Sequence, residues 1–338
     1  MDVRLVFPER GKVECQPHYA PDPGPGQVRV ASTLSLMSTG TENIVFNGDF
    51  APRTHFARYG ALPFFPGYLT VGVVDAVGHG VSGIANGRRV FHRAGHGSRF
   101  TLPATTVTAI PDGVGDEEAV WIGLAKIAFR AAHAAPFRLA ERLAIVGSGP
   151  VGQMALRWAA AASCEAIAVV GRSPRRLEFA ISGGATHVIQ APVEKAAAIV
   201  SDALGGAPQF VVDTTGSAEA FEGVLALAGR YGTIILLGDT GHPGAQSLTS
   251  DVMVKGLTIT AVHDSHDEHG GDEHRILRFV LDLMTRGRFD CAGLITHSFT
   301  PECAIDAYRL ANERRAETMG IAFTWSTSAS ARNIAMKR

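Results

Sequence analysis

The fold is decided by residues 143–152, LAIVGSGPVG, in which a short apolar run is followed by three glycines. This pattern predicts a strand, a tight turn and the start of a helix. Gly147 lets the chain turn away from the strand, Gly149 carries no Cβ that would keep the backbone away from a pyrophosphate, and Gly152 allows the helix to lie close to the sheet. The free N–H groups at the helix N-terminus would face the phosphates. The stretch is therefore a dinucleotide-binding signature.

The residues that follow strengthen this interpretation. Val151, Met154, Ala155 and Trp158 recur at helical spacing, so one face of the helix can be buried against a sheet. A second predicted strand, residues 166–170, then follows as a βαβ unit requires. A glycine-rich turn that binds no nucleotide is the alternative, and the second strand argues against it.

The composition describes a globular protein without a standing basic patch. The chain has 338 residues, more than a usual single domain, which predicts two domains. Apolar residues make up 46% and charged residues 19%, which argues against extensive disorder. The net charge of -1 favours neither nucleic acid nor an anionic membrane. No apolar run reaches the roughly 18 to 20 residues of a membrane span, and the N-terminus has no apolar core, so we expect a cytoplasmic protein.

The residue pattern of the chain changes after Pro111-Asp112-Gly113. Before this point, β-rich segments at 28–31, 71–77 and 89–91 alternate with Gly- and Pro-rich turns, as in a compact antiparallel barrel. After it, an Ala-rich helical stretch from Asp116 to about Ala135 leads into alternating strands and helices, which predict a doubly wound parallel sheet. The strands are predicted at 143–146, 166–170, 187–190, 210–213, 233–237 and 257–261. Helices are predicted at 277–285 and 301–314, a strand at 320–324, and a loosely ordered tail after Trp325.

This order of segments resembles the medium-chain dehydrogenase/reductases over nearly the whole chain. The matching pieces, besides the glycine motif, are Pro66-Gly67 with Gly72-Val73-Val74, then Gly87-Arg88-Arg89-Val90, Asp213-Thr214-Thr215-Gly216 and Gly293-Leu294-Ile295-Thr296-His297. The resemblance implies an α/β protein with a GroES-like β-rich catalytic domain and a Rossmann domain with a doubly wound parallel sheet. We expect the first at residues 1–115 and 264–338, the second at 116–263, and the active cleft between them.

Within this superfamily, residues 38–42, 66–68 and the turn at His96 are most similar to the branch that contains 2-desacetyl-2-hydroxyethyl bacteriochlorophyllide dehydrogenase. The resemblance implies the interconversion of a ketone and a secondary alcohol by hydride transfer with a nicotinamide cofactor. The substrate is expected to be a small-molecule carbonyl compound or alcohol.

The end of the second strand distinguishes the two nicotinamide cofactors. NAD-specific sites have an acidic side chain there, about 20 residues after the glycines, for the ribose 2′-OH. This chain has Gly171, followed by Arg172, so no carboxylate repels a 2′-phosphate and a guanidinium can bind it. We therefore predict NADP(H), the alternative being that the arginines only solubilise the next helix. The predicted cofactor-binding residues are Gly147, Gly149, Pro150, Val151, Gly152, Gly171, Arg172, Ser173, Arg176, Thr215 and Gly238.

The positions that hold zinc in the zinc enzymes of the superfamily carry other residue types here. They read Thr39-Gly40-Thr41-Glu42, Gly67-Tyr68-Leu69 and Trp121-Ile122-Gly123. A catalytic zinc needs about three N, S or carboxylate ligands, and these positions do not supply them. The four cysteines are too widely spaced for a CxxC site. The His-rich segment 262–269, with His274, is the one rival, which we interpret as a solvated loop. The enzyme is thus predicted to be zinc-independent.

Without zinc, the charge that develops on a carbonyl oxygen must be met by a proton donor. The resemblance implies three candidates. Thr41 matches a hydroxyl that relays protons, Tyr68 occupies the position of a zinc-ligand histidine, and His96 lies where the chain passes the substrate. Their structural alternatives are a helix cap, a core aromatic and a turn residue. Weaker candidates are Glu42, Tyr59 and His263.

Two other functions stay open at this point. One is an NADPH-dependent quinone or enoyl reductase, and the other is an NADPH-binding protein without catalysis, since a fold does not determine a function. The resemblance also implies that strand 257–261 pairs with its copy across a two-fold axis, which predicts a homodimer.

Overall fold

The computed structural model describes residues 1–134, 141–266 and 273–325, which form two compact units. The first contains Met1–Asp49, His55–Gly123 and the chain from Cys291 onward, and the second contains Phe50–Thr54 and Leu124–Asp290. The end of the predicted Ala-rich helix, part of the His-rich segment and the tail after Trp325 lie outside the described residues. No described helix is both long enough and apolar enough to cross a membrane.

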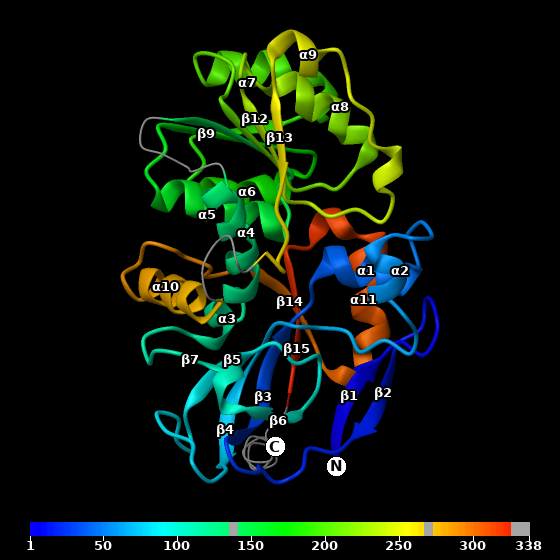
Figure 1. Cartoon of the computed structure of the whole chain (residues 1–338), viewed down its shortest axis with the longest axis vertical. Helices are drawn as coiled ribbons and strands as arrows, with labels where there is room; N and C mark the ends of the chain where they lie inside the picture. The colour runs from blue at the N-terminus through cyan, green and yellow to red at the C-terminus, as the bar shows by residue number, and fades with distance from the viewer. Residues whose placement is uncertain (135–140, 267–272, 326–338) are drawn as a thin grey trace, which may run out of the picture. The chain divides into compact units, whose positions relative to one another are not determined.

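The first unit is built around a seven-stranded sheet of order β14-β15-β3-β4-β5-β7, with β6 paired to β3 (Figure 1). Its pairs are antiparallel except β14 with β15. Buried valines of β3, β4 and β5, among them Val30, Val74 and Val90, form a core on one face. The strands are β1 (Asp2–Val6), β2 (Glu14–His18), β3 (Gln27–Leu36), β4 (Thr70–Val77), β5 (Arg89–His92), β6 (Arg99–Pro103), β7 (Thr108–Ala109), β14 (Ile295–Phe299) and β15 (Gly320–Thr324). The helices are α1 (Thr39–Asn47), α2 (His55–Tyr59), α3 (Asp116–Ala119) and α11 (Ala304–Glu313), with short 3-10 turns η1 (Ala104–Thr106), η5 (Pro301–Cys303) and η6 (Arg315–Glu317).

The second unit is a six-stranded parallel sheet of order β10-β9-β8-β11-β12-β13 (Figure 1). This is the doubly wound order of a Rossmann fold, and the direction of winding reverses between β8 and β11. The strands are β8 (Arg142–Val146), β9 (Ala166–Gly171), β10 (His187–Gln190), β11 (Phe210–Asp213), β12 (Thr233–Leu236) and β13 (Thr258–Ala261). The helices are α4 (Ile122–Ala134), α5 (Pro150–Ala161), α6 (Pro174–Ser182), α7 (Ala197–Ala203), α8 (Ala218–Leu227), α9 (Asp251–Lys255) and α10 (Glu273–Thr285), with η2 (Val193–Lys195) and η3 (Pro243–Ala245). The predicted α/β class, with a GroES-like and a Rossmann part, is confirmed.

The boundaries of the units differ from those expected. The sequence predicts the return to the first domain at residue 264, whereas α10 has its contacts in the second unit and the return occurs at Cys291. The reason lies in the packing of α10 and the segment after it on α5. The ring of Trp158 stacks on Phe279 at 5.7 Å and meets Phe289 edge-on at 5.1 Å.

Candidate functional site

The glycine turn between β8 and α5 is held by Thr214, at the end of β11. Its hydroxyl donates to the carbonyls of Val146 at 2.9 Å and Gly147 at 3.2 Å. Gly147 has a φ of 101°, a left-handed conformation that favours glycine, and a Cβ there would collide with the Thr214 hydroxyl. A Cβ on Gly152 would collide with the Gly147 carbonyl. Both glycines are therefore required by the protein's own packing.

Gly149 is different, because the protein leaves space beside it. It precedes α5 in an extended conformation, with Pro150 as the first helical residue. The nearest atom to a Cβ on Gly149 would be Nη1 of Arg176, at an ordinary contact distance of 3.4 Å. An open glycine, a helix N-terminus and a guanidinium thus lie together. These residues fit a dinucleotide pyrophosphate, whose charge they would meet with N–H groups.

The end of β9 lies against the same turn. Gly171 is buried, and a Cβ there would lie 2.5 Å from the hydroxyl oxygen of Ser148, so an acidic side chain could not fit without moving Ser148. Arg172 is exposed. Ser173 caps α6 by accepting from the Arg176 N–H at 3.3 Å. The structure thus brings Gly171 and Arg176 to the glycine turn, while Ser173 caps the helix that carries Arg176.

Thr215 and Gly238 belong to the neighbouring strand ends. The buried Asp213 accepts from the N–H of Thr215 at 2.8 Å and from its hydroxyl at 2.6 Å. Burial raises the pKa of Asp213, and the two Thr215 hydrogen bonds act in the opposite direction. A Cβ on Gly238 would lie 2.5 Å from the N atom of Gly216. This close packing fixes the loop that carries Thr215.

In the first unit, a hydrogen-bonded cluster surrounds the start of α1. The hydroxyls of Tyr68 and Ser38 lie 2.6 Å apart, and the Ser38 N–H donates to Oε1 of Glu42 at 2.7 Å. The other carboxylate oxygen of Glu42 accepts from the Tyr308 hydroxyl at 2.5 Å and contacts His96 Nε2 at 3.1 Å. Burial, with the Glu42 charge beside it, raises the pKa of Tyr308 well above its usual value, so Tyr308 stays a phenol and donates.

His96 lies inside this cluster, with 1% of its surface exposed. Its Nδ1 lies 2.8 Å from the Ser35 hydroxyl, which also accepts from the Trp325 indole at 2.9 Å. Because Ser35 accepts from Trp325, its own proton can go to Nδ1, which leaves the Nε2 proton for Glu42. Both ring nitrogens are therefore engaged by the protein.

The three predicted proton donors thus have different surroundings. Tyr68 is half-buried, and its hydroxyl is hydrogen-bonded to that of Ser38. Thr41 is half-buried in the first turn of α1. His96 is buried and contacts the Glu42 carboxylate. Sequence reasoning missed Ser38 and Tyr308. A signal for Ser38 exists, because a polar residue followed by Glu at a helix start resembles a capping box. Tyr308 lies 266 positions from Glu42, and no local pattern connects them.

The positions expected for zinc do not fit that metal. Thr39, Tyr68 and Trp121 offer a hydroxyl, a phenol and an indole, whereas zinc sites use thiolates, imidazoles and carboxylates. Within either unit, the described residues contain no three His, Cys, Asp or Glu side chains with ligand atoms mutually within 4.8 Å. In the described part of the His-rich segment, Nδ1 of His263 lies 2.8 Å from the Ser265 hydroxyl.

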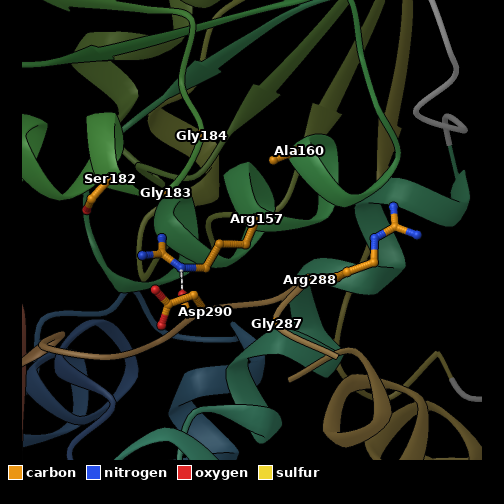
Figure 2. Close-up of a pocket in the computed structure, with 8 residues that line it drawn as sticks. All are labelled: Arg157, Ala160, Ser182, Gly183, Gly184, Gly287, Arg288 and Asp290. Carbon is orange, nitrogen blue, oxygen red and sulfur yellow. Dashed lines mark hydrogen bonds between the residues drawn. The ribbon is translucent and has the colours of Figure 1, made fainter. Parts of the chain in front are cut away.

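A cavity of about 150 Å³ lies in the second unit, beside the later half of α5 (Figure 2). The Arg157 guanidinium extends across it and donates to the Asp290 carbonyl and to the Gln153 side chain, the latter at 2.8 Å. Arg288 donates to the Ala161 carbonyl at 2.8 Å. Both arginines thus tie the segment after α10 to α5. The cavity is lined by Arg157, Ala160, Ser182, Gly183, Gly184, Gly287, Arg288 and Asp290.

The sequence is similar to one family model and to several known proteins. Residues 150–277 match the family model described as zinc-binding dehydrogenase. An L-threonine 3-dehydrogenase from Anaeromyxobacter is 28% identical, over 87% of this chain and 92% of that protein. An L-threonine 3-dehydrogenase from Bacillus subtilis is 31% identical over 47% of this chain and 44% of that protein. The chain therefore spans less than half of the length of the Bacillus enzymes that it matches.

Solved structures share the fold. A protein from Sinorhizobium meliloti, described as a zinc-binding dehydrogenase and bound to NADP, has a TM-score of 0.79, 18% identity, and coverage of 96% of this chain and 99% of that chain. RspB from Escherichia coli, in complex with NADH, has a TM-score of 0.79, 21% identity and the same coverage. The family model thus matches the central part of the chain, and the Anaeromyxobacter enzyme is similar over most of its length.

Proposed function

We propose that this protein is a zinc-independent, NADP(H)-dependent oxidoreductase that interconverts a ketone and a secondary alcohol. The observation that carries the proposal is the turn of residues 147–152, whose outer glycines are required by packing while Gly149 leaves space for a pyrophosphate. The relatives named as L-threonine 3-dehydrogenases support oxidation of a secondary alcohol. The bacteriochlorophyllide branch stays a prediction.

The residues at the end of β9 favour NADP(H) over NAD(H). Gly171 offers no carboxylate to a ribose 2′-OH, and its contact with Ser148 leaves no space for one. Arg172 is exposed beside it and carries a permanent positive charge. One solved structure of the same fold contains NADP and another NADH, which supports a nicotinamide cofactor of either kind.

The proton chemistry is assigned to Tyr68. When bound, the cofactor supplies or accepts the hydride at the substrate carbon. In the direction of reduction, Tyr68 donates its hydroxyl proton to the carbonyl oxygen, and the Ser38 hydroxyl at 2.6 Å orients it. Glu42 holds the Ser38 backbone, and Tyr308 and His96 hold Glu42. Glu42 and His96 therefore act as positioning residues in this proposal.

Zinc independence rests on the hydroxyl, phenol and indole at the expected ligand positions. The test is elemental analysis of the purified protein together with activity after treatment with a chelator. We expect substoichiometric zinc and unchanged turnover. Stoichiometric zinc that is lost together with activity would overturn this part of the proposal.

The activity itself is tested by following NADPH oxidation with a panel of ketones and a matched panel of enones and quinones. Turnover of ketones, with NADPH preferred over NADH, is the expected result. Turnover of enones alone would make the protein an enoyl or quinone reductase. Tight NADPH binding without oxidation on either panel would indicate a cofactor-binding protein without catalysis.

A further inference from the structure

A polar side chain, Gln153, lies in the apolar packing of α5. It is in the first turn of the helix, directly after Gly152, and it is fully buried. The next two residues, Met154 and Ala155, are also fully buried, and both are apolar. A polar group in such a place costs free energy unless its hydrogen bonds are made. The partners of the Gln153 amide therefore indicate what this residue does.

The amide nitrogen of Gln153 contacts two segments of the candidate cofactor site. It donates to the Ser148 carbonyl, in the glycine turn, at 3.3 Å. It also donates to the Arg176 carbonyl, in the first turn of α6, at 3.1 Å. An amide NH2 group has two donors, so both are used. The glycine turn and the start of α6 are thus attached to the same side chain.

Arg157, one turn further along α5, fixes the orientation of this amide. Its guanidinium donates to Oε1 of Gln153 at 2.8 Å. It also donates to the Asp290 carbonyl (Figure 2). Because a guanidinium has donors only, the amide oxygen must face Arg157 and the amide nitrogen must face the two carbonyls. A reversed amide would place donor against donor and carbonyl against carbonyl.

The two attached segments carry different parts of the proposed cofactor site. The glycine turn and the N-terminus of α5 are assigned to the pyrophosphate, which NADPH and NADH share. The start of α6 comes directly after Arg172 and Ser173, and Arg172 is assigned to the 2′-phosphate, which only NADPH carries. NADPH must meet both segments with a phosphate at the same time. Its binding therefore depends more strongly on the distance between them.

We propose that Gln153 is a positioning residue that holds the glycine turn and the start of α6 at a fixed separation, and that it thereby determines the preference for NADPH over NADH. This inference rests on the proposed function, because it takes the turn and Arg172 as the two phosphate sites. Gln153 acts through the Ser148 and Arg176 carbonyls and does not touch the cofactor. Loss of its amide should weaken the binding of NADPH more than that of NADH.

The experiment measures Kd for NADPH and for NADH by titration calorimetry. Gln153→Leu keeps a side chain of similar size and removes the amide. We expect it to raise Kd for NADPH about 10-fold more than Kd for NADH, the range for the loss of two buried hydrogen bonds. Gln153→Asn has the same amide on a shorter side chain and should give a smaller change. Arg157→Met leaves both donors of Gln153 in place and should also give a smaller change.

Val224→Ala is the control for a purely structural effect. Val224, on α8, is fully buried in a different part of the second unit, among apolar residues of the sheet and of α7 and α8. Its replacement leaves a cavity and lowers stability. Urea midpoints show how the loss of stability compares with that of Gln153→Leu. We expect Val224→Ala to leave the ratio of the two Kd values unchanged.

A ratio that falls in Gln153→Leu and not in Val224→Ala supports the proposal, even if no ketone is turned over and the proposed activity fails. An unchanged ratio in Gln153→Leu, or in Gln153→Asn if the first variant does not fold, would overturn it and leave the dehydrogenase intact. An equal change in Val224→Ala would overturn it as well, since the preference would then follow stability alone. A wild type that binds both cofactors equally would overturn it together with the assignment of Arg172.

Discussion

The glycines in the turn after β8 differ in what a Cβ atom would contact at each position. A Cβ on Gly152 meets the Gly147 carbonyl, whereas a Cβ on Gly149 meets only Nη1 of Arg176 at 3.4 Å. Gly149 also has ordinary backbone angles, with φ of −79° and ψ of −175°, which alanine adopts without strain. Gly152 is therefore required by packing, whereas Gly149 is not, and the proposed function assigns Gly149 to cofactor binding.

Gly149→Ala should therefore fold normally and bind the cofactor poorly. We expect an unchanged urea midpoint and a Kd for NADPH raised about 10- to 100-fold, because the methyl group takes the space of a charged phosphate. Gly152→Ala should lose about 1 to 3 kcal/mol of stability through the collision. Gly244→Ala is the control, since a Cβ there meets nothing within 4 Å. Wild-type NADPH affinity in Gly149→Ala would exclude this turn as the pyrophosphate site.

In the proposed function, the choice between the two cofactors depends on Arg172. It is exposed at the end of β9, so its replacement leaves the fold intact. Arg172→Ala should raise KM for NADPH about 10- to 100-fold and change KM for NADH little, because only NADPH carries the 2′-phosphate. Arg175→Ala, another exposed arginine at the start of α6, is the control. Equal effects of Arg172→Ala on both cofactors would refute the assignment.

At the scale of elements, α1 is attached to the rest of the first unit through Glu42. The carboxylate accepts from the Ser38 N–H, from Tyr308 and from His96, and an amide cannot accept from all three. We expect Glu42→Gln to lose about 1 to 3 kcal/mol of stability. It should also lower kcat for ketone reduction while the Kd for NADPH stays unchanged, since Tyr68 loses its fixed partner.

Tyr308→Phe serves as the milder comparison, because it removes one donor and leaves the Glu42 contacts with Ser38 and His96. Its kcat should lie between those of wild type and Glu42→Gln. If Glu42→Gln lowers stability and leaves kcat unchanged, Glu42 is structural and does not position Tyr68.

Strand β5 contains a buried histidine, His92, whose protonation would lower the stability of the folded protein. Burial lowers the pKa of His92 to about 3, from an ordinary value of 6.5. Below pH 6.5 the unfolded chain binds a proton at His92 that the folded chain does not bind, until the pH approaches 3. Stability is therefore lost as the pH falls through this window, by about 1.4 kcal/mol per pH unit, and is unaffected by His92 above it.

His92→Asn removes this titration while keeping an acceptor near Nδ1, which accepts from the Ala94 N–H at 3.2 Å. Between pH 7 and pH 4.5 the wild type should lose up to about 3 kcal/mol more than the variant. Urea unfolding followed by tryptophan fluorescence at both pH values measures the difference. Parallel pH dependence of the two proteins would show that His92 is not neutral and buried.

At the scale of the whole molecule, local sequence patterns are sufficient to predict the strands of the Rossmann sheet. They are not sufficient to predict which residues meet in the candidate site. Each strand from β8 to β13 lies within one residue of its predicted bounds, because strand and turn signals are local. The placement of α10 depends on Trp158, more than 100 positions earlier in the chain, and the cluster around Glu42 depends on Tyr308. The sequence Gly95-His96-Gly97 predicts a turn, but it does not show that Glu42 and Ser35 enclose the ring.

The outer edge of the parallel sheet bears on the assembly of the molecule. In the described part of the chain, β13 pairs with β12 alone. The N–H groups of Thr258 and Val262 donate inward, to Gly232 and Leu236. Because N–H directions alternate along a strand, the N–H of Ala261 points away from β12. An open edge of this kind is available to a second strand.

We propose that two copies of the chain pair along this edge in a homodimer. Sedimentation equilibrium should give twice the mass of one chain. Ala261→Pro removes an outward N–H and should shift the protein toward the monomer, whereas Thr258→Ala, on the same strand, keeps every N–H and should leave the dimer intact. A monomeric wild type would contradict the proposal. A dimer that is unaffected by Ala261→Pro would place the interface elsewhere, because edge-to-edge pairing depends on those outward N–H groups.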